Sequence, residues 1–341
     1  MRVTARLVLA VLLALPFFAG ASSVILTTSF LAEFLGQGRW RALSALSPEP
    51  AVRPLPTPPR PRPVAVDLHV RAALLRPPAL VLVHGLSPEG KNDARLREAA
   101  GLLARSGWAV AVPTVDGLTA LRLRPEDASA VSATVAALHD AGYHRVAVLG
   151  ISLGAGPALL AAAEPEIAAG VSAVLALGGY ASAVELLRYT LTGAYDHGGV
   201  SGRHRVQEAT IAQFARANTE LVDEAGRRLV ENRDPASLDA LVRALPQSTR
   251  DLLDALSPGR RLGGLRAPLF LIHGRQDPAV PFTESLRLEA AARAAGRPVR
   301  AAIVGAVGHV EADRRAGLAD LLQLWATFYA FRLTAERAPA G

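Results

Sequence analysis

The pentapeptide Gly150–Gly154, with the pattern Gly-x-Ser-x-Gly, lies between a strand-like and a helix-like segment. Residues 145–149 before it are mainly apolar and β-branched, as in a buried parallel strand. Residues 155–163 after it are small and helix-forming beyond Pro157. In this context a strand turns directly into a helix, and the turn holds the serine in a strained conformation with its Oγ exposed. We therefore interpret Ser152 as a nucleophile; the alternative is a serine that only caps a helix.

Strand-like and helix-like segments alternate along most of the chain, which is typical of an α/β protein with a mostly parallel sheet. The first strand, residues 64–70, alternates apolar and polar side chains and is expected near a sheet edge. We predict one α/β domain over residues 64–336, in which helices flank the sheet. The other predicted strands are residues 79–83, 108–113, 145–149, 171–177, 269–273 and 299–304, and the predicted helices are residues 93–105, 125–141, 155–163, 283–295 and 312–331.

The alternation stops between residues 181 and 264, where no strand-like run occurs. This segment is charged and helix-prone, with eleven acidic side chains, eleven arginines, and helix breakers at Gly198–Gly199, Pro235 and Pro246. We interpret it as a helical cap inserted into the sheet. An insertion after residues 171–177 emerges at the carboxyl ends of the strands, so its helices are expected to cover Ser152.

Residues 7–32 carry no charged side chain and follow two arginines. The run exceeds the roughly 20 residues that span a bilayer, which favours an N-terminal hydrophobic membrane helix within residues 1–36. The alternative is a cleaved signal peptide that ends at the small residues 19–21. Residues 37–63 are predicted to form a linker, because the eight prolines of residues 47–63 make that part stiff and unable to pack.

Composition narrows the classes of function. The chain has no cysteine, which excludes a disulfide framework, thiol catalysis and cysteine-ligated metal. Of the net charge of +7, residues 1–63 contribute +5, from seven arginines and two glutamates, so the rest of the chain carries +2. Lys91 is the only lysine, and the arginines do not form a phosphate-binding stripe. Nucleic acid is therefore not an expected partner.

Four elements resemble those of the α/β-hydrolase family, over residues 64–331 with the cap excepted. They are His84–Gly85 after an early strand, the turn at Ser152, and Asp277 and His309 after late strands. Serine, acid and histidine follow one another in the order expected of that fold. The resemblance implies an α/β-hydrolase sheet and a serine hydrolase that needs no metal and no organic cofactor.

The resemblance also implies the catalytic roles. A serine hydroxyl is a poor nucleophile at neutral pH and needs a base within hydrogen-bond reach. His309 is the expected base, since it follows the strand at residues 299–304 on a glycine-bearing loop. Asp277 is expected to orient His309 and to stabilise its imidazolium. Some members of the family carry the acid after the preceding strand, but residues 178–181 hold no carboxylate.

The tetrahedral intermediate needs hydrogen-bond donors aimed at its oxyanion. The backbone N–H of Leu153 is one expected donor, because it follows the nucleophile, and by resemblance the N–H of Leu86 is the other. In the cap, Phe214 and Tyr189 are expected to line the substrate pocket. The glycine-rich residues 195–202 are expected to act as a hinge or mobile tip.

These expectations describe a serine hydrolase that forms an acyl-enzyme on Ser152. A carboxylic ester, small or lipid-like, is the expected substrate. A peptidase or an acyltransferase would use the same triad and stays open, and a non-catalytic binding protein on the same fold is a further alternative. The hydrolase domain is expected outside the cytoplasm, held by the N-terminal membrane helix or exported after signal cleavage.

Overall fold

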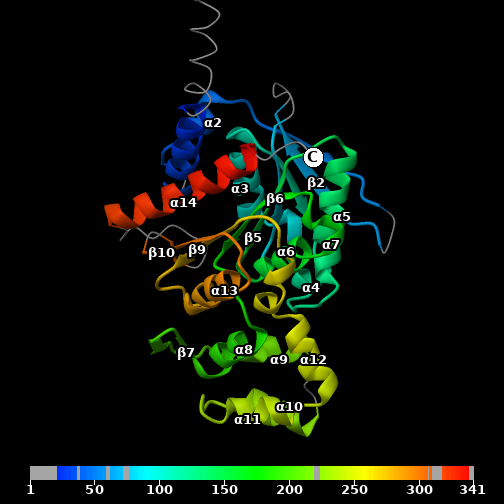
Figure 1. The fold of residues 1–341 in the computed structure, drawn as a ribbon, viewed down its shortest axis with the longest axis vertical. Coiled ribbons are helices and arrows are strands. Elements are labelled where there is room, and N and C mark those ends of the chain that lie inside the picture. The colour runs from blue at the N-terminus through cyan, green and yellow to red at the C-terminus, as the bar shows by residue number, and fades with distance from the viewer. Residues whose placement is uncertain are drawn as a thin grey trace, which may run out of the picture.

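The computed structural model describes residues 21–36, 39–58, 62–71, 77–218, 223–305, 307–308 and 317–337. Its centre is an eight-stranded sheet in the order β1-β2-β4-β3-β5-β6-β9-β10 (Figure 1). From β4 to β10 neighbouring strands pair in parallel, whereas β1 and β2 are antiparallel to their neighbours, so the prediction of a mostly parallel sheet is confirmed. The strands are β1 (Ala51–Pro54), β2 (Val66–Val70), β3 (Ala79–Val83), β4 (Ala109–Pro113), β5 (Val146–Ile151), β6 (Val171–Leu177), β9 (Leu269–Gly274) and β10 (Val299–Val304).

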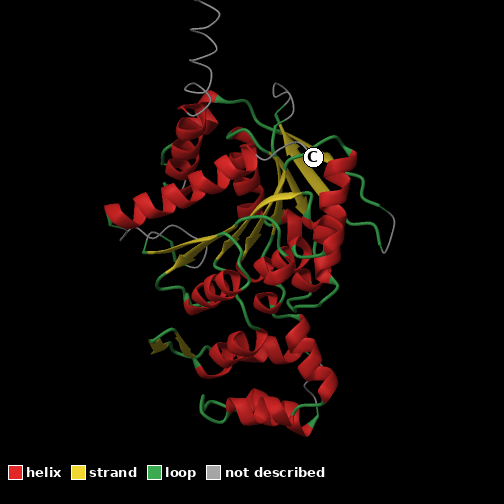
Figure 2. Ribbon diagram, in the orientation of Figure 1, coloured by secondary structure: helices red, strands yellow, loops and turns green. Residues whose placement is uncertain are grey.

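Helices flank the sheet (Figure 2). Side chains alternate along each strand, so Leu80 and Leu82 join a hydrophobic cluster with α3 and α14, whereas Val81 and Val83 join another with α5 and α6. Because both faces are buried, the strands β3, β4 and β5 carry no polar side chain. The helices outside the cap are α2 (Ala42–Leu46), α3 (Ala94–Arg105), α4 (Asp116–Thr119), α5 (Asp127–Asp140), α6 (Ala155–Ala162), α7 (Pro165–Ala168), α13 (Thr283–Ala294) and α14 (Leu318–Arg337), with 3₁₀ turns η1 (Gly90–Asn92) and η2 (Ser152–Gly154).

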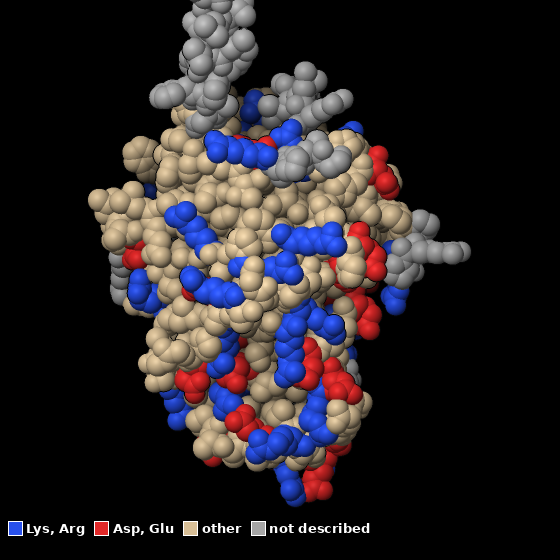
Figure 3. All heavy atoms as spheres, in the orientation of Figure 1, with Lys and Arg blue, Asp and Glu red and all other residues tan. Residues whose placement is uncertain are grey.

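The cap lies between β6 and β9 in the chain and forms the lower layer of Figure 1. It has its own hydrophobic cluster, which includes Leu187, Leu191 and Leu229. On the face seen in Figure 3, acidic side chains and arginines are interspersed over the cap, and ion pairs such as Arg188–Asp239 at 2.6 Å join its helices. Its elements are α8 (Ala183–Thr192), β7 (Ala194–His197), β8 (Val200–Arg203), α9 (Glu208–Ala217), α10 (Glu224–Glu231), α11 (Leu238–Ala244), α12 (Gln247–Ala255), η4 (Pro258–Arg260) and η5 (Leu262–Gly264).

One part of the cap differs from the prediction. Residues 194–203, for which no strand was expected, form the antiparallel hairpin β7–β8. Gly198 and Gly199 make its two-residue turn, with φ of 59° and 81°. Such turns need positive φ at both central residues, which explains the glycine pair. The hinge role of residues 195–202 stays a prediction.

Helix α13 of the core fixes the beginning of the cap. The buried Glu284 accepts the backbone N–H groups of Ala181 and Ser182 through Oε2, both at 2.9 Å. Arg287, one turn further along α13, places Nη2 3.1 Å from Oε2 of Glu185 in α8. The orientation of α8 over the sheet edge is therefore determined by contacts with the core as well as by the cap cluster.

The N-terminal segment packs differently from the prediction. Residues 21–35 form a helix whose Phe30 ring stacks on Phe328 of α14, with centroids 5.0 Å apart. The apolar side of this helix is thus used by the domain, and the prediction of a membrane helix does not hold for residues 21–36. Among the described residues no helix is both long and apolar enough to cross a bilayer. Residues 1–20 of that prediction lie outside the described residues.

The proline-rich stretch also differs from the predicted linker. β1, within residues 37–63, adds an edge strand to the sheet by pairing with β2, and Leu55 after it is buried. Pro54 is tolerated because an edge strand has one side without ladder partners. The prediction that this stretch cannot pack is therefore wrong, and the domain begins before residue 64.

Candidate active site

Ser152 lies where β5 turns into α6, with one 3₁₀ turn between them. Its φ of 53° lies in the left-handed region, which is the strained conformation expected of this turn. Glycine is needed on both sides of the turn. A Cβ on Gly150 would lie 2.5 Å from Ala155 Cα, and a Cβ on Gly154 would lie 2.1 Å from the carbonyl oxygen of His84.

The loop after β3 lies against Ser152. A Cβ on Gly85 would come within 3.1 Å of Ser152 Cβ, so this close approach depends on glycine. The buried His84 fixes the loop: its Nε2 accepts the N–H of Val115 at 3.0 Å, which leaves the proton on Nδ1, 2.7 Å from the Gly85 carbonyl oxygen. In a trans peptide the N–H points away from the C=O, so the N–H of Leu86 is directed away from the imidazole.

The role of His84 leads to a prediction for stability. Burial lowers the pKa of His84 below its ordinary value of 6.5, against opposing effects of the Gly85 hydrogen bond and Asp93. The unfolded chain then binds the proton more readily than the folded chain, so the free energy of unfolding should fall as the pH drops below 6.5. His84→Ala should flatten this dependence, as measured by urea unfolding between about pH 8 and pH 5.

The same substitution should lower kcat by about 100-fold, because the Gly85 carbonyl is no longer held and a small displacement of the loop is costly. His69 and His197, whose pKa values burial also lowers, remain in both proteins and cancel in the comparison. If the free energy of unfolding changed with pH in the same way in the wild type and in His84→Ala, His84 would not titrate as described.

Asp277 lies three residues beyond the end of β9, and its side chain is buried. Its Oδ1 accepts the N–H groups of Ala279 at 2.8 Å and Val280 at 3.0 Å, which closes an Asx turn. Its Oδ2 is 3.4 Å from Nε2 of the buried His273, whose Nδ1 is 2.7 Å from Ser285 Oγ. The carboxylate is therefore oriented by the backbone of its own loop, and the buried His273, whose Nε2 is also 3.0 Å from the Val280 carbonyl oxygen, lies beside it.

The predicted base, His309, lies outside the described residues. The preceding residue, Gly308, is described and lines the same cavity as Ser152. Gly308 also lies against the end of β9, since a Cβ on Gly274 would be 1.9 Å from its carbonyl oxygen. The chain thus passes between the strand end that leads to Asp277 and the cavity that holds Ser152.

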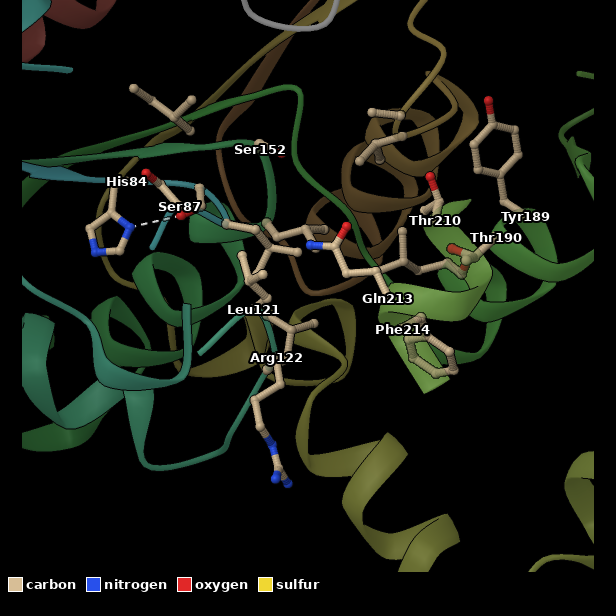
Figure 4. A pocket seen from close by; sticks show the side chains of 18 of the residues that line it. His84, Ser87, Leu121, Arg122, Ser152, Tyr189, Thr190, Thr210, Gln213 and Phe214 are labelled. Carbon is tan, nitrogen blue, oxygen red and sulfur yellow. Dashed lines mark hydrogen bonds between the residues drawn. The ribbon is translucent and has the colours of Figure 1, made fainter. Parts of the chain in front are cut away.

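A cavity of about 1270 Å³ lies between the carboxyl edge of the sheet and the cap. In Figure 4, Ser152, Ser87 and Leu121 lie on its core side, and Thr190 and Gln213 face it from α8 and α9. The cap therefore encloses the candidate nucleophile and supplies much of the cavity wall. Its apolar lining includes Leu86, Leu121, Leu123, Leu153, Leu177, Leu186, Leu187, Phe214, Leu252, Leu253 and Leu256.

Both cap residues predicted for the pocket, Phe214 and Tyr189, line this cavity. Tyr189 has a second role that the sequence did not indicate. Its hydroxyl is 2.7 Å from His204 Nδ1 and donates to the carbonyl oxygen of Pro278 at 2.9 Å. Burial raises the pKa of Tyr189, so the hydroxyl keeps its proton. The cap is thereby connected to the residue that follows Asp277.

This connection predicts a separation of effects between two variants. Tyr189→Phe keeps the ring but removes the hydroxyl's contacts with His204 and with the Asp277 loop. Since the Asp277 loop then loses one hydrogen bond, kcat should fall about tenfold for all substrates. Phe214→Ala should instead reorder the preference among acyl chain lengths. Steady-state kinetics on a chain-length series checks both; a change of preference in Tyr189→Phe would contradict the connecting role of its hydroxyl.

Sequence reasoning did not indicate several parts of the cavity wall, including the face of α3 that carries Leu96 and Leu102. Leu121 and Arg122 line it from the loop after α4, and Phe34 lines it from the N-terminal helix. The loop residues lie between a predicted strand and a predicted helix, where no periodicity marks a wall. Phe34 lies within the segment that was interpreted as a membrane helix. Neither had a signal that would have placed it at the site.

The fold is shared with several solved peptidases. Acylaminoacyl peptidase of Pyrococcus horikoshii matches with a TM-score of 0.60 and 16% identity, over 89% of this chain and 45% of that one. A puromycin-hydrolysing peptidase of Mycobacterium tuberculosis matches with a TM-score of 0.56 and 19% identity, over 84% of this chain and 39% of that one. Dipeptidyl peptidase 4 of Porphyromonas gingivalis matches with a TM-score of 0.53 and 13% identity, over 83% of this chain and 35% of that one. This chain thus spans less than half the length of each.

These likenesses establish the class of the fold: the chain has the α/β-hydrolase fold, as its motifs predicted. No protein-family model matches the sequence, and no curated protein matches it.

Proposed function

We propose that the protein is a serine hydrolase whose nucleophile is Ser152. The observation that supports this most directly is the left-handed conformation of Ser152 in the wall of a cavity that the cap encloses. Backbone strain of this kind persists where the surrounding structure fixes it, and it is typical of the exposed serine in this fold. The buried Asp277 and the close approach of Gly85 to Ser152 add further support.

In the proposed mechanism Ser152 Oγ attacks the carbonyl carbon of the substrate while His309 accepts its proton. The N–H groups of Leu86 and Leu153 stabilise the oxyanion of the tetrahedral intermediate. His309 then protonates the leaving group, and an acyl-enzyme remains on Ser152. Water attacks the acyl carbon, gives one proton to His309, and releases the acid as Ser152 regains its proton. Asp277 holds His309 in the required tautomer.

A carboxylic ester with an apolar chain is the substrate class that we propose. The support is the predominance of leucine side chains around Ser152, since an alkyl chain gains binding free energy from such a wall. A peptidase is the second candidate, because the solved structures that share the fold are named peptidases. An acyltransferase would differ only in replacing water by another acceptor.

The deciding experiment compares p-nitrophenyl esters of increasing acyl length with aminoacyl arylamides, using the full chain. A higher kcat/KM for the esters supports the first candidate, and a higher value for the arylamides supports the second. Labelling of Ser152 by a fluorophosphonate separates both from a non-catalytic binding protein. Absence of both labelling and turnover would refute the proposed function.

For the N-terminus we propose an export signal within residues 1–21 in place of a membrane anchor. With residues 21–35 packed on the domain, 14 uncharged residues remain, 7–20, which is short for a bilayer span and suits the apolar part of a signal peptide. Mass spectrometry of the protein from its native host should then find a mature N-terminus at Ser22. Retention of residues 1–21 after an alkaline membrane wash would favour the anchor.

A further inference from the structure

Leu121 has an unusual backbone conformation beside the candidate active site. Among the described residues, Ser152 and Leu121 are the two non-glycine residues with positive φ, at 53° and 60°. Both line the same cavity. The left-handed region is unfavourable for a residue with a Cβ, so its use at Leu121 calls for a compensating role of the side chain.

The ends of other helices show that glycine suits this position. α4 ends with bonds from the Arg122 N–H to the Gly117 carbonyl at 2.9 Å and from the Leu121 N–H to the Leu118 carbonyl at 3.2 Å, which form a Schellman motif. The same pair of bonds ends α3, α5 and α13. At the position of Leu121, those helices have Gly107, Gly142 and Gly296, each with positive φ.

Packing of the core does not account for the leucine. Leu118 and Leu123 on either side pack in the core cluster, whereas Leu121 belongs to none of the hydrophobic clusters that the described residues form. In Figure 4, Leu121 lies on the core side of the cavity, and Gln213 extends toward that side from α9. The contact that this side chain offers is therefore with the contents of the cavity.

The loop that carries Leu121 is held firmly. The buried carboxylate of Asp127 accepts the N–H of Gly117 through Oδ1 and the N–H of Arg124 through Oδ2, both at 2.9 Å. One side chain thus fixes the loop on both sides of Leu121. Such fixing is what allows a strained conformation to persist, and it holds the isobutyl group at a constant place in the wall.

We propose that Leu121 is a specificity-determining residue that contacts the apolar chain of a substrate bound at Ser152. The inference rests on the proposed function and names a feature of its substrate, an alkyl chain that packs against Leu121. Glycine would relieve the backbone but would leave that part of the wall without a contact. The leucine therefore selects longer chains at a cost to the backbone of the α4 terminus.

The test compares Leu121→Ala with Leu121→Gly in the full chain. Both remove the isobutyl group, but only glycine tolerates positive φ well. Labelling of Ser152 is measured with ethyl and dodecyl fluorophosphonates, and both variants should lower the dodecyl-to-ethyl ratio of rate constants by about tenfold. Leu121→Gly should melt about 2 °C above Leu121→Ala, because it relieves the backbone.

Gly142→Ala is the matched control. Gly142 occupies the same position at the end of α5, with φ of 86°, and no atom lies within 4 Å of a Cβ built there. This variant should lower the melting temperature without changing the labelling ratio. A wild-type ratio in both Leu121 variants would overturn the inference, and so would an equal change of the ratio in Gly142→Ala.

If Ser152 of the wild type is not labelled, the proposed function fails, and a binding measurement decides the inference. Fluorescence titration with dansyl-undecanoic acid should then show about tenfold weaker binding to both Leu121 variants. Binding equal to that of the wild type would overturn the role of Leu121 independently of catalysis.

Discussion

Ser152→Ala is expected to lower kcat by about 10⁶-fold for every substrate. The triad members act as a unit, and without the serine hydroxyl only water is left to attack the substrate, at a far lower rate. Labelling by a fluorophosphonate should disappear with it. Far-UV circular dichroism should be unchanged, since the substitution removes a single oxygen atom and leaves Gly150 and Gly154, on which the close contacts of the β5–α6 turn depend, in place. An alanine variant that keeps more than about a tenth of wild-type kcat would contradict the assignment.

A companion variant tests the strain at the same position. Ser152→Gly lacks the hydroxyl as Ser152→Ala does, but it adopts the φ of 53° without steric cost. Its free energy of unfolding should therefore exceed that of Ser152→Ala by about 1 kcal/mol, as measured by urea unfolding. Equal stability of the two inactive variants would mean that the turn is not strained.

Local patterns explain why much of the core and the serine turn could be predicted. A strand buried on both faces must be apolar throughout, so residues 79–83 and 146–149 are recognisable without knowledge of their partners. The turn at Ser152 depends on residues within one pentapeptide and on the strand and helix beside it. In both cases the physical requirement lies in contiguous sequence.

The N-terminal segment could not be predicted in the same way. An uncharged apolar run satisfies a bilayer and a protein core equally well, and the choice depends on α14, whose Phe328 lies far along the chain from Phe30. Likewise, the proline-rich stretch gave no sign that β2 offers it an open edge. The left-handed Leu121 has no sequence signature at all, since glycine fills this position at the ends of α3, α5 and α13.

For the candidate catalytic acid, Asp277, local sequence predicts the turn but does not by itself predict the catalytic role. The tripeptide Asp-Pro-Ala occurs twice, at residues 234–236 and 277–279. Each aspartate accepts the N–H of the alanine through Oδ1, at 3.0 Å for Asp234 and 2.8 Å for Asp277. Local sequence thus predicts the same turn twice. Only the position of Asp277 after β9, and its burial there beside His273, distinguish a candidate catalytic acid from an exposed turn former on the cap.

Asp277→Asn should therefore separate charge from structure. The asparagine Oδ1 can still accept the N–H groups of Ala279 and Val280, so the turn and the melting temperature should be nearly unchanged. The negative charge is lost and the amide favours the wrong histidine tautomer, so kcat should fall by about 10⁴-fold. Asp277→Ala removes both functions, and it should lose stability as well as activity.

Asp234→Asn is the control, because it makes the same chemical change in the same tripeptide on the exposed cap. It should keep wild-type kcat and stability. Steady-state kinetics and thermal melts of the three variants together decide whether Asp277 acts through its charge or only as a turn former. If Asp277→Asn kept its activity while Asp277→Ala lost it, the carboxylate would be a turn former like Asp234, and the orienting acid would have to be sought elsewhere. If both Asp277 variants lose activity and only Asp277→Ala loses stability, the charge itself is what the reaction requires.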